Sequence, residues 1–518
     1  MKKRIFGAVA LAGIAALTLA SCGHNDQTTS GDKPTTTTTT GTPKTTTGTN
    51  TTPTGTNTTT TNPTPTSTVE IKDGVYEDKT LDLSSAIDST RFGGEKEIVF
   101  YHTMGDNLTA VLQVAIDEFE AKYPGWKINH SQIGGYDDVL QKCISSLAAG
   151  AQPDLAYCYA DHVAQYIRSG KVVDMSDYVH ATGTIDGNKI GYTDAELADF
   201  VPGYFAEGYA TNYGLYDKIG YNDTDMLTFP FVKSTEVLYY NKDALTAAGI
   251  TKAPETWDEL WADCEILVDV FDQCTPLGYD SEANWVITMA AQNGWGYTSA
   301  AEPHFLFKNE GLTNWLDQLY QYHGEYYFTT QKEYGGYTSG LFTMGPEAGG
   351  TVFSIGSSGG AKHQETNDFK WGVAPIPGSV QENGSVNKSV ISQGPSLVMF
   401  QSSKSNATER QLMTWEFVKC LEGAKFQAQF SMASGYNPTR KSTFQIEEYE
   451  DFLSEKTNIV AVTAGVAAQM TNDFFTSPAF SGSSTARGQM ESVLLYVISG
   501  QKSGAQALQD ALTACGGN

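Results

Sequence analysis

The chain has 518 residues, with 33 Lys and Arg against 59 Asp and Glu, and a formal net charge of −26. This length predicts roughly two to four domains. Residues 69–518 alone carry 28 positive and 57 negative side chains. That balance argues against a nucleic-acid groove, which needs clustered Lys and Arg, and it disfavours polyanionic ligands.

The first 94 residues are expected to export and tether the protein. Residues 1–4 are basic and residues 5–20 are apolar or small, a pattern typical of a signal peptide. The following Leu-Ala-Ser-Cys at 19–22 resembles a bacterial lipobox, which implies cleavage after residue 21 and lipidation of Cys22. An ordinary secretory signal that happens to contain a cysteine is the alternative.

A threonine-rich tract follows this leader. Of the 41 residues between Thr28 and Thr68, 24 are threonine, so the tract has little apolar surface to bury and is expected to stay disordered. We interpret residues 22–94 as a lipidated cysteine and a flexible tether. No later stretch is long and apolar enough to span a membrane. The folded part is therefore expected at the extracellular face of the cell membrane.

Six cysteines remain after Cys22, an even number that permits up to three disulfides without fixing their connectivity. Cys264 and Cys274 are close enough in sequence to be the most plausible local pair. Cys143 and Cys420 fall within helical patterns and are equally well explained as small buried hydrophobic residues. No Cys-x-x-Cys pair or tight His/Cys group occurs, so no metal is expected.

From about residue 95 the pattern alternates between strands and helices. Residues 97–101 read as a buried strand, and the apolar residues between 108 and 119 recur at helical spacing. Strands separated by helices in this way predict βαβ units with a parallel sheet. The next predicted elements are a strand at 126–130, a helix at 136–149, a strand at 154–159 and a helix from 161 to 168.

The second half of the chain contains fewer clear strands. A strand is predicted at 235–240, and Thr256 and Glu259 have the spacing of a capping box that opens a helix to about residue 270. Further strands are predicted at 371–375 and 396–400, followed by helices at 406–421, 423–432, 485–498 and 505–514.

Several short stretches, in this order, resemble one known family. They resemble the extracellular solute-binding proteins of ABC importers, specifically the sugar-binding family 1 group of maltose-binding-protein-like lipoproteins. The most specific stretch is TEVLYYNKD at 235–243, continued by PETWDEL at 254–260. The other stretches are IVFYH at 98–102, FEAKYP at 119–124, GAQPDL at 150–155, YADH at 159–162, WEF at 415–417 and SGYNPTR at 434–440.

This resemblance implies an α/β fold of two lobes, of the periplasmic-binding-protein type II, with a hinge and a ligand in the cleft between the lobes. We expect lobe one at 95–230 and 390–432, and lobe two at 231–389 and 433–515. The implied partners are a small molecule, with sugar favoured, and the permease subunits of an ABC transporter. No cofactor and no enzymatic activity are expected.

Candidate ligand-binding residues in the first lobe follow strand ends, because such residues face the cleft in open α/β sheets. Sugars need hydroxyl recognition by carboxylates, amides and Arg, together with aromatic faces for stacking. These criteria select His102, Gly105, Asp106, Tyr136, Asp161 and His162. Most aromatic residues are nevertheless expected in the core.

Further candidates lie at the first crossover and in the second lobe. The resemblance implies a cleft carboxylate at Glu236, with a hinge salt bridge as the alternative. Trp295 lies among glycine and polar neighbours and is a better stacking candidate than Trp285, which suits a core position equally well. The remaining candidates are Gly356, Ser357, Tyr436 and Arg487.

Two other classes of protein fit part of the pattern. A secreted glycoside hydrolase needs two carboxylates held about 5–10 Å apart, and abundant Asp and Glu make such pairs uninformative. No Gly-x-Ser-x-Gly or His-Glu-x-x-His motif occurs, so serine hydrolases and zincins lack support. A surface adhesin on a stalk fits the threonine tract but not the downstream stretches.

Overall fold

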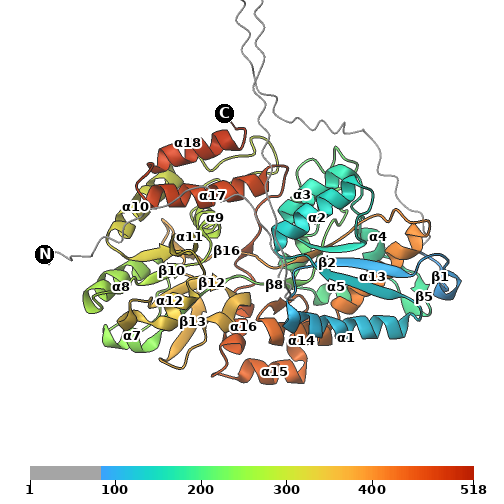
Figure 1. The fold of residues 1–518 in the computed structure, drawn as a ribbon, viewed down its shortest axis with the longest axis horizontal. Helices are drawn as coiled ribbons and strands as arrows, with labels where there is room; N and C mark the ends of the chain where they lie inside the picture. Colours follow the sequence, from blue (N-terminus) through green and yellow to red (C-terminus); the bar gives the residue numbers. More distant parts are fainter. Residues whose placement is uncertain (1–82, 518) are drawn as a thin grey trace, which may run out of the picture. The chain divides into compact units, whose positions relative to one another are not determined.

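The structure, a computed structural model, describes residues 83–517. The signal peptide, Cys22 and the threonine-rich tract lie outside the described residues. Two five-stranded sheets, each with its own helices, organise the described part (Figure 1). The two-lobed α/β fold class is therefore confirmed.

The first sheet has the strand order β3-β2-β4-β17-β7. The predicted parallel arrangement holds for β2 with β3 and β4, but β17 runs antiparallel to both β4 and β7. Strand β17 can run antiparallel because it enters from a distant part of the chain and not through a βαβ crossover. The strand bounds are β2 Glu97–His102, β3 Lys127–Gln132, β4 Leu155–Cys158, β7 Phe229–Pro230 and β17 Ser396–Met399.

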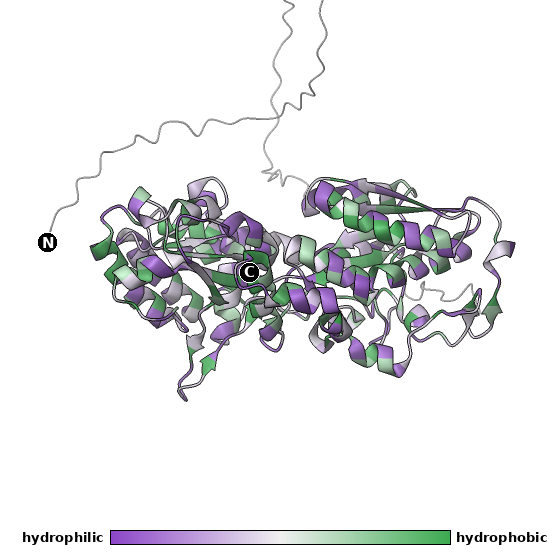
Figure 2. Ribbon diagram, turned by 90° about the horizontal axis from the view of Figure 1, so that it is seen from below, coloured by the Kyte–Doolittle hydropathy of each residue, from purple (hydrophilic) through white to green (hydrophobic). Residues whose placement is uncertain are grey.

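Helices cover this sheet through their apolar faces. Helix α1 buries Leu112, Ile116 and Phe119, which share one face, and it packs against α13 and α14. Figure 2 shows helix ribbons that alternate between hydrophilic and hydrophobic segments, as expected of helices with one face on a core. The bounds are α1 Asp106–Lys122, α2 Tyr136–Ala148, α3 Ala160–Tyr166, α13 Ala407–Leu421 and α14 Ala424–Ser434.

The second sheet has the order β11-β10-β12-β9-β13, with β9 antiparallel to β12 and β13. Its strands are β9 Glu236–Asn241, β10 Leu277–Tyr279, β11 Phe328–Thr330, β12 Phe353–Ser357 and β13 Trp371–Pro375. Its larger helices are α8 Trp257–Val270, α9 Glu282–Gln292, α10 Glu310–Gly324, α16 Ile459–Gln469, α17 Ser483–Ile498 and α18 Gly504–Ala514. Helix α17 packs against α9, α10 and α18.

Shorter α-helices and strands lie between these larger elements. The short helices are α4 Ser176–Val179, α5 Asp194–Asp199, α6 Pro202–Ala206, α7 Lys242–Ala247, α11 Gln331–Tyr334, α12 Ser339–Met344 and α15 Glu447–Ser454. The short strands are β1 Ala86–Ile87, β5 Thr184–Ile185, β6 Asn188–Lys189, β8 Val232–Lys233, β14 Ser379–Val380, β15 Val386–Asn387, β16 Val390–Ile391, β18 Asn437–Pro438 and β19 Phe474–Phe475.

The chain crosses between the two sheets near β8 and β16, which lie between them in Figure 1. Strand β8 pairs with β18, and Ser234 forms a β-bridge with Gln393. These pairings join the crossing segments to one another. The side chains of these crossing segments therefore lie beside the space between the two sheets.

The two sheets have separate hydrophobic cores. The first contains residues between Ile98 and Val232 and between Leu397 and Phe430. The second contains residues between Val237 and Val390 and between Ile459 and Leu512. Burying such side chains contributes roughly 1.5–3 kcal/mol each, so each core stabilises its own lobe.

The predicted tether extends too far. Residues 83–94 were assigned to it, but β1 pairs with β5, and Leu83, Ile87 and Phe92 pack against the first core. Packing of these apolar side chains on the first core places residues 83–94 within the fold. The first-lobe fold thus begins before residue 95.

All six described cysteines are free thiols, including Cys264 and Cys274, so the suggested local disulfide is wrong for this structure. Both are buried, and Cys264 lies in the apolar face of α8, consistent with a packing role. Among residues 83–517, no helix combines the length and hydropathy needed to cross a membrane.

Candidate functional site

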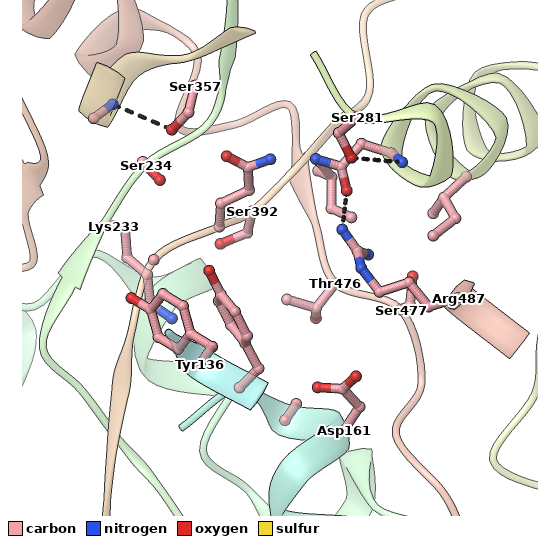
Figure 3. Close-up of a pocket in the computed structure, with 18 of the residues that line it drawn as sticks. Tyr136, Asp161, Lys233, Ser234, Ser281, Ser357, Ser392, Thr476, Ser477 and Arg487 are labelled. Atoms are coloured by element: carbon pink, nitrogen blue, oxygen red, sulfur yellow. Dashed lines mark hydrogen bonds between the residues drawn. The ribbon is translucent and has the colours of Figure 1, made fainter. Parts of the chain in front are cut away.

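A cavity of about 620 Å³ lies between the two sheets. This volume suits a small organic molecule, since ligand pockets commonly span about 300–1,000 Å³. Figure 3 shows Tyr136 and Lys233 on one side of it, with Ser281 and Arg487 on the other. Both lobes and the crossing segments therefore contribute to one site.

The first-lobe wall of the cavity is aromatic. Tyr136 is the first residue of α2, and Tyr159 caps the start of α3, so both follow strands of the first sheet. Their rings stack with centroids 4.3 Å apart and planes at 30°. Tyr136 and Tyr436 also pack against the first core. The wall thus offers phenol rings and hydroxyls at its surface while the core fixes their positions.

Asp161 and His162 lie beside this aromatic wall, in the first turn of α3. Asp161 accepts a hydrogen bond from the Ser484 hydroxyl at 3.0 Å. Burial lowers the pKa of His162, which favours its neutral form. Asp161 faces the cavity as a hydrogen-bond acceptor, and its contact with α17 joins the two lobes at this wall.

The second-lobe wall is built from a buried chain of polar groups. Asn284, in the first turn of α9, donates from Nδ2 to Glu236 Oε1 at 3.0 Å. Its Oδ1 accepts a hydrogen bond from Arg487 of α17 (Figure 3). Tyr279 donates its hydroxyl to Glu236 Oε2 at 2.7 Å. Asn284 and Arg487 line the cavity, whereas Glu236 is completely buried behind them.

Burial raises the pKa of Glu236 to about 7, although the hydrogen bonds from Tyr279 and Asn284 and the charge of Arg487 oppose that shift. The carboxyl group therefore titrates near neutral pH. The alternative of a hinge salt bridge is not what the structure shows, because Glu236 bonds to a phenol and an amide.

Asp280 and Ser281 extend the second-lobe wall between β10 and α9. Asp280 accepts from the Thr338 backbone at 2.7 Å and from its hydroxyl at 2.8 Å. Burial raises the pKa of Asp280. Ser281 caps α9 with φ 103°, a backbone region that residues other than glycine rarely adopt. The strained cap places Asn284 in the first turn, because the Ser281 hydroxyl accepts from the Asn284 backbone.

An ion pair lies among the crossing segments on the cavity lining. Lys233 of β8 donates to Glu207 at 2.5 Å and to the Ser396 hydroxyl at 3.0 Å. Ser392 donates to the other oxygen of Glu207 at 2.6 Å. Lys233 is only 2% exposed, so Glu207 neutralises its charge inside the protein.

Ser357 and Gly359 bring the second lobe close to Tyr436. The Ser357 hydroxyl accepts from the Gly359 backbone at 3.2 Å (Figure 3). A Cβ atom at Gly359 would lie 3.0 Å from the Tyr436 ring. A larger residue at position 359 would therefore push against this ring.

The structure brings together one group of the candidates predicted from sequence and leaves the others outside the cavity lining. Those on the lining are Tyr136, Asp161, His162, Ser357, Tyr436 and Arg487. Those outside it are His102, Gly105, Asp106, Glu236, Trp285, Trp295 and Gly356.

The first-lobe candidates outside the lining have structural environments of their own. His102 is fully buried, and its Nε2 lies 2.9 Å from Nδ1 of His130. Its Nδ1 accepts from the Met104 backbone at 3.1 Å. Gly105 and Asp106 form the N-terminus of α1. The rule that residues after strand ends face the cleft therefore identified the edge of the sheet that borders the cavity. At β2, however, the residues it selected do not line the cavity.

The two tryptophans also lie outside the lining. Trp285 is fully buried and stacks on Tyr279 with centroids 4.4 Å apart and planes at 11°. Trp295 packs against the second core and over Gly311, where an added Cβ would approach its ring within 2.3 Å. Gly356 lies on β12 facing Asp280. Trp285 thus takes the core position that the sequence left open, and Trp295, the preferred stacking candidate, is corrected to a packing residue outside the lining.

Several lining residues were not selected from sequence. Tyr159 ends the segment after β4, two residues before the selected Asp161, and the same strand-end argument applies to it. Lys233 and Ser392 flank crossovers between the lobes, whose exact positions cannot be read from the sequence. Tyr337 follows Gly335 and Gly336 and is 69% exposed at the cavity.

Among the described residues, no group of three or more His, Cys, Asp or Glu could hold a metal ion. The cavity lining offers hydrogen-bonding groups, charged side chains and aromatic rings. The lining includes the carboxylates of Asp137, Asp161, Glu207 and Asp280, against the cations Lys233 and Arg487.

Comparisons with known proteins agree with this architecture. Residues 114–455 match the family described as Bacterial extracellular solute-binding protein. The sn-glycerol-3-phosphate-binding periplasmic protein UgpB of Escherichia coli K12 is 23% identical over 439 residues, which cover 80% of this chain and 90% of that protein. UgpB of Yersinia pestis bv. Antiqua is 23% identical over 69% of this chain and 77% of its own length.

Solved structures share the fold at lower identity. UgpB from Mycobacterium tuberculosis, in complex with glycerophosphocholine, has a TM-score of 0.64 and 18% identity, covering 82% of this chain and 98% of its own. The GacH receptor of Streptomyces glaucescens, solved unliganded and with acarbose, has a TM-score of 0.63 and 16% identity, with the same coverage.

Proposed function

Since the chain belongs to the family of bacterial extracellular solute-binding proteins, we propose that its solute is a sugar, with an oligosaccharide as the first choice. The protein binds this sugar in the cavity between its lobes and delivers it to the permease of an ABC importer. It has no catalytic role in this proposal.

The observation that carries the sugar assignment is the pairing of two unlike walls. Tyr136, Tyr159 and Tyr436 offer ring faces to the apolar CH side of a sugar, while Asn284 and Arg487 offer polar groups to its hydroxyls. Sugars combine these two kinds of surface in one molecule.

The charges on the lining favour a neutral sugar over the anion sn-glycerol-3-phosphate. Four lining carboxylates face two permanent cations, and Lys233 already neutralises Glu207. An anionic solute would meet net negative charge, which is unfavourable in a partly desolvated site. Glycerophosphates remain the competing solute, because the named relatives bind sn-glycerol-3-phosphate and glycerophosphocholine.

The lobe boundaries and the anchor form part of the same proposal. Lobe one comprises 95–230 and 390–432, extended by residues 83–94, and lobe two comprises 231–389 and 433–515. The two separate cores follow this division away from the crossings, where Phe231 and Val232 belong to the first core and Val390 to the second. A lipid on Cys22 holds the protein at the extracellular face of the membrane, and the threonine tract gives it reach.

The test is a thermal-shift screen of the full chain, followed by calorimetry. The probes are maltotriose, mannotriose, acarbose, glycerophosphocholine and sn-glycerol-3-phosphate. A tight ligand at 100 times its Kd stabilises by roughly 2.7 kcal/mol, and we expect such a shift with at least one carbohydrate. A shift with the two phosphates alone would replace sugar by glycerophosphate, and cleavage of a carbohydrate probe would indicate an enzyme.

A further inference from the structure

Glu236 is a buried carboxylate that lies behind the cavity wall and does not face the solute. It is 0% exposed and is the first residue of β9, directly after the crossing segment. Each carboxylate oxygen has one partner, the Tyr279 hydroxyl for Oε2 and Asn284 Nδ2 for Oε1. Its hydrogen-bonded link to the cavity lining therefore runs through Asn284.

We propose that Glu236 is a positioning residue for the solute site, which fixes the amide of Asn284 so that Oδ1 faces Arg487 and holds that guanidinium at the cavity wall. This inference rests on the proposed function, because it assigns Arg487 and Asn284 to solute binding. It assigns Glu236 a role other than direct contact with the sugar.

The chemistry of the amide explains the role. An amide has an acceptor oxygen and a donor nitrogen, so it can bridge a carboxylate and a guanidinium in only one orientation. An ionised carboxylate only accepts hydrogen bonds, and it therefore binds the Nδ2 side of Asn284. The reversed amide would set donor against donor at Arg487 and acceptor against acceptor at Glu236.

The partner on the other side of Glu236 is also held in place. The ring of Tyr279 stacks on Trp285, which is fully buried, and this contact directs the phenol toward Glu236. Trp285, a predicted solute contact, thus belongs to the support of the positioning group. With Oε2 occupied by Tyr279, Oε1 is the oxygen that receives Asn284.

Protonation of Glu236 weakens its preference for one orientation of the Asn284 amide. The groups that act on Glu236 are Tyr279 and Asp280 from the end of β10, Asn284 from α9 and Arg487 from α17. Burial outweighs the opposing effects of Tyr279, Asn284 and Arg487 and raises the pKa of Glu236 to about 7. A protonated carboxyl group can donate as well as accept, so it no longer enforces one amide orientation. Affinity for the sugar should fall as pH decreases through neutrality.

The first test needs no solute. In the full chain labelled with 15N-asparagine, the side-chain amide resonance of Asn284, assigned by its loss in Asn284→Leu, is followed from pH 5.5 to 8.5. We expect a shift with a midpoint near pH 7 that is absent in Glu236→Gln. The matched control is Glu282→Gln, another buried glutamate of the same lobe, which accepts from the Lys332 backbone outside the cavity lining.

The second test is the affinity for whichever of maltotriose, mannotriose or acarbose gives the largest thermal shift. Between pH 8.5 and 5.5 we expect the wild-type affinity to fall about fivefold more than that of Glu236→Gln, because His162 and Asp280 of the lining are present in both proteins. At pH 8.5 the Glu236→Gln variant should bind about tenfold more weakly than wild type, because it loses a charge-assisted hydrogen bond. Glu282→Gln should follow the wild-type curve.

The outcomes separate the two proposals. If no carbohydrate binds wild type but the Asn284 resonance titrates and Glu236→Gln abolishes that titration, the sugar assignment fails and the positioning role stands. If a carbohydrate binds and Glu236→Gln keeps the wild-type pH profile, the positioning role is overturned and the sugar assignment stands. An Asn284 resonance that does not titrate in wild type also overturns it.

Discussion

The two walls of the cavity are built in different ways. The first-lobe wall is an extension of a hydrophobic core, in which Tyr136 and Tyr436 pack against apolar residues and expose part of each ring. The second-lobe wall is a hydrogen-bonded chain, in which Arg487 depends on Asn284 and Asn284 depends on Glu236. Packed rings tolerate loss of a neighbour, whereas a polar chain fails when one link is removed.

This difference predicts how substitutions in each wall should change the affinity for the solute. A change in the aromatic wall should reduce affinity in proportion to the ring surface lost. A substitution in the polar chain should also affect the neighbouring groups of that chain. A buried donor or acceptor that loses its hydrogen-bond partner raises the free energy of the protein by about 1–3 kcal/mol. The following changes test that contrast.

The largest expected effect is the pH dependence of stability that comes from Glu236. Burial raises the pKa of Glu236 from 4.5 to about 7, so the folded chain holds this proton more tightly than the unfolded chain. The free energy of unfolding should therefore fall as pH rises from about 4.5 to 7, and this group alone should account for about 3 kcal/mol of the fall. Chemical denaturation at pH 4.5 and pH 8 measures it.

Glu236→Gln removes the titrating group, so its stability should fall about 3 kcal/mol less than that of wild type over the same interval. Other buried acids, such as Asp174, whose pKa burial raises to about 6, remain in both proteins and cancel in the comparison. Equal falls in wild type and Glu236→Gln would contradict the assignment of a buried, titrating carboxylate to the polar wall.

The next effect is on binding through the polar wall. Asn284→Leu removes both hydrogen bonds of the amide while keeping a side chain of similar size, and it leaves Arg487 and Glu236 without their shared partner. We expect carbohydrate affinity to fall about 30-fold, equivalent to about 2 kcal/mol. Calorimetry at pH 8 measures this loss.

The control for that change is Asn293→Leu. Asn293 caps the other end of α9 and donates to Met289 and Ser379 outside the cavity lining. It should keep wild-type affinity, although it loses two hydrogen bonds of its own. If both variants lost affinity equally, the effect would come from α9 as a whole and not from the polar chain.

A smaller effect is expected at the aromatic wall. Tyr136→Leu removes a ring that stacks on Tyr159, and carbohydrate affinity should fall about tenfold because aromatic contacts contribute about 0.5–1.5 kcal/mol beyond their buried area. Tyr136→Phe keeps the ring and should retain most of the affinity. A loss in Tyr136→Phe as large as in Tyr136→Leu would show that the hydroxyl matters more than the ring face.

Most of the fold could be predicted from sequence, because its helices and strands carry regular burial patterns. Helix α1, for example, buries Leu112, Ile116 and Phe119 on one face, and the periodicity shows it. Helices α9, α10 and α16 were missed. In α9 nearly every residue is buried, polar ones such as Asn284 and Gln292 included, so its polar residues do not mark an exposed face.

Individual site residues were harder to predict than the edges on which they lie. Asn284 and Trp285 are neighbours in α9, yet one lines the cavity and the other stacks on Tyr279 in the core. Successive helix residues point about 100° apart, and only tertiary packing decides which one faces the solute. The predicted capping box at Thr256 is half formed. The Thr256 hydroxyl accepts from the Glu259 backbone, but the Glu259 carboxylate accepts from the Glu255 backbone and not from that of Thr256.

Trp295→Ala should have the smallest effect on binding, and it separates packing from recognition at the polar wall. Trp295 lies over Gly311 and against the second core, outside the cavity lining. Its removal should cost about 2 kcal/mol of stability, less than the roughly 3–5 kcal/mol of a fully buried tryptophan, because it is only partly buried. Carbohydrate affinity should stay within about twofold of wild type. A tenfold loss of affinity would mean that recognition on this side extends to a ring held by packing, and the contrast between the two walls would then fail.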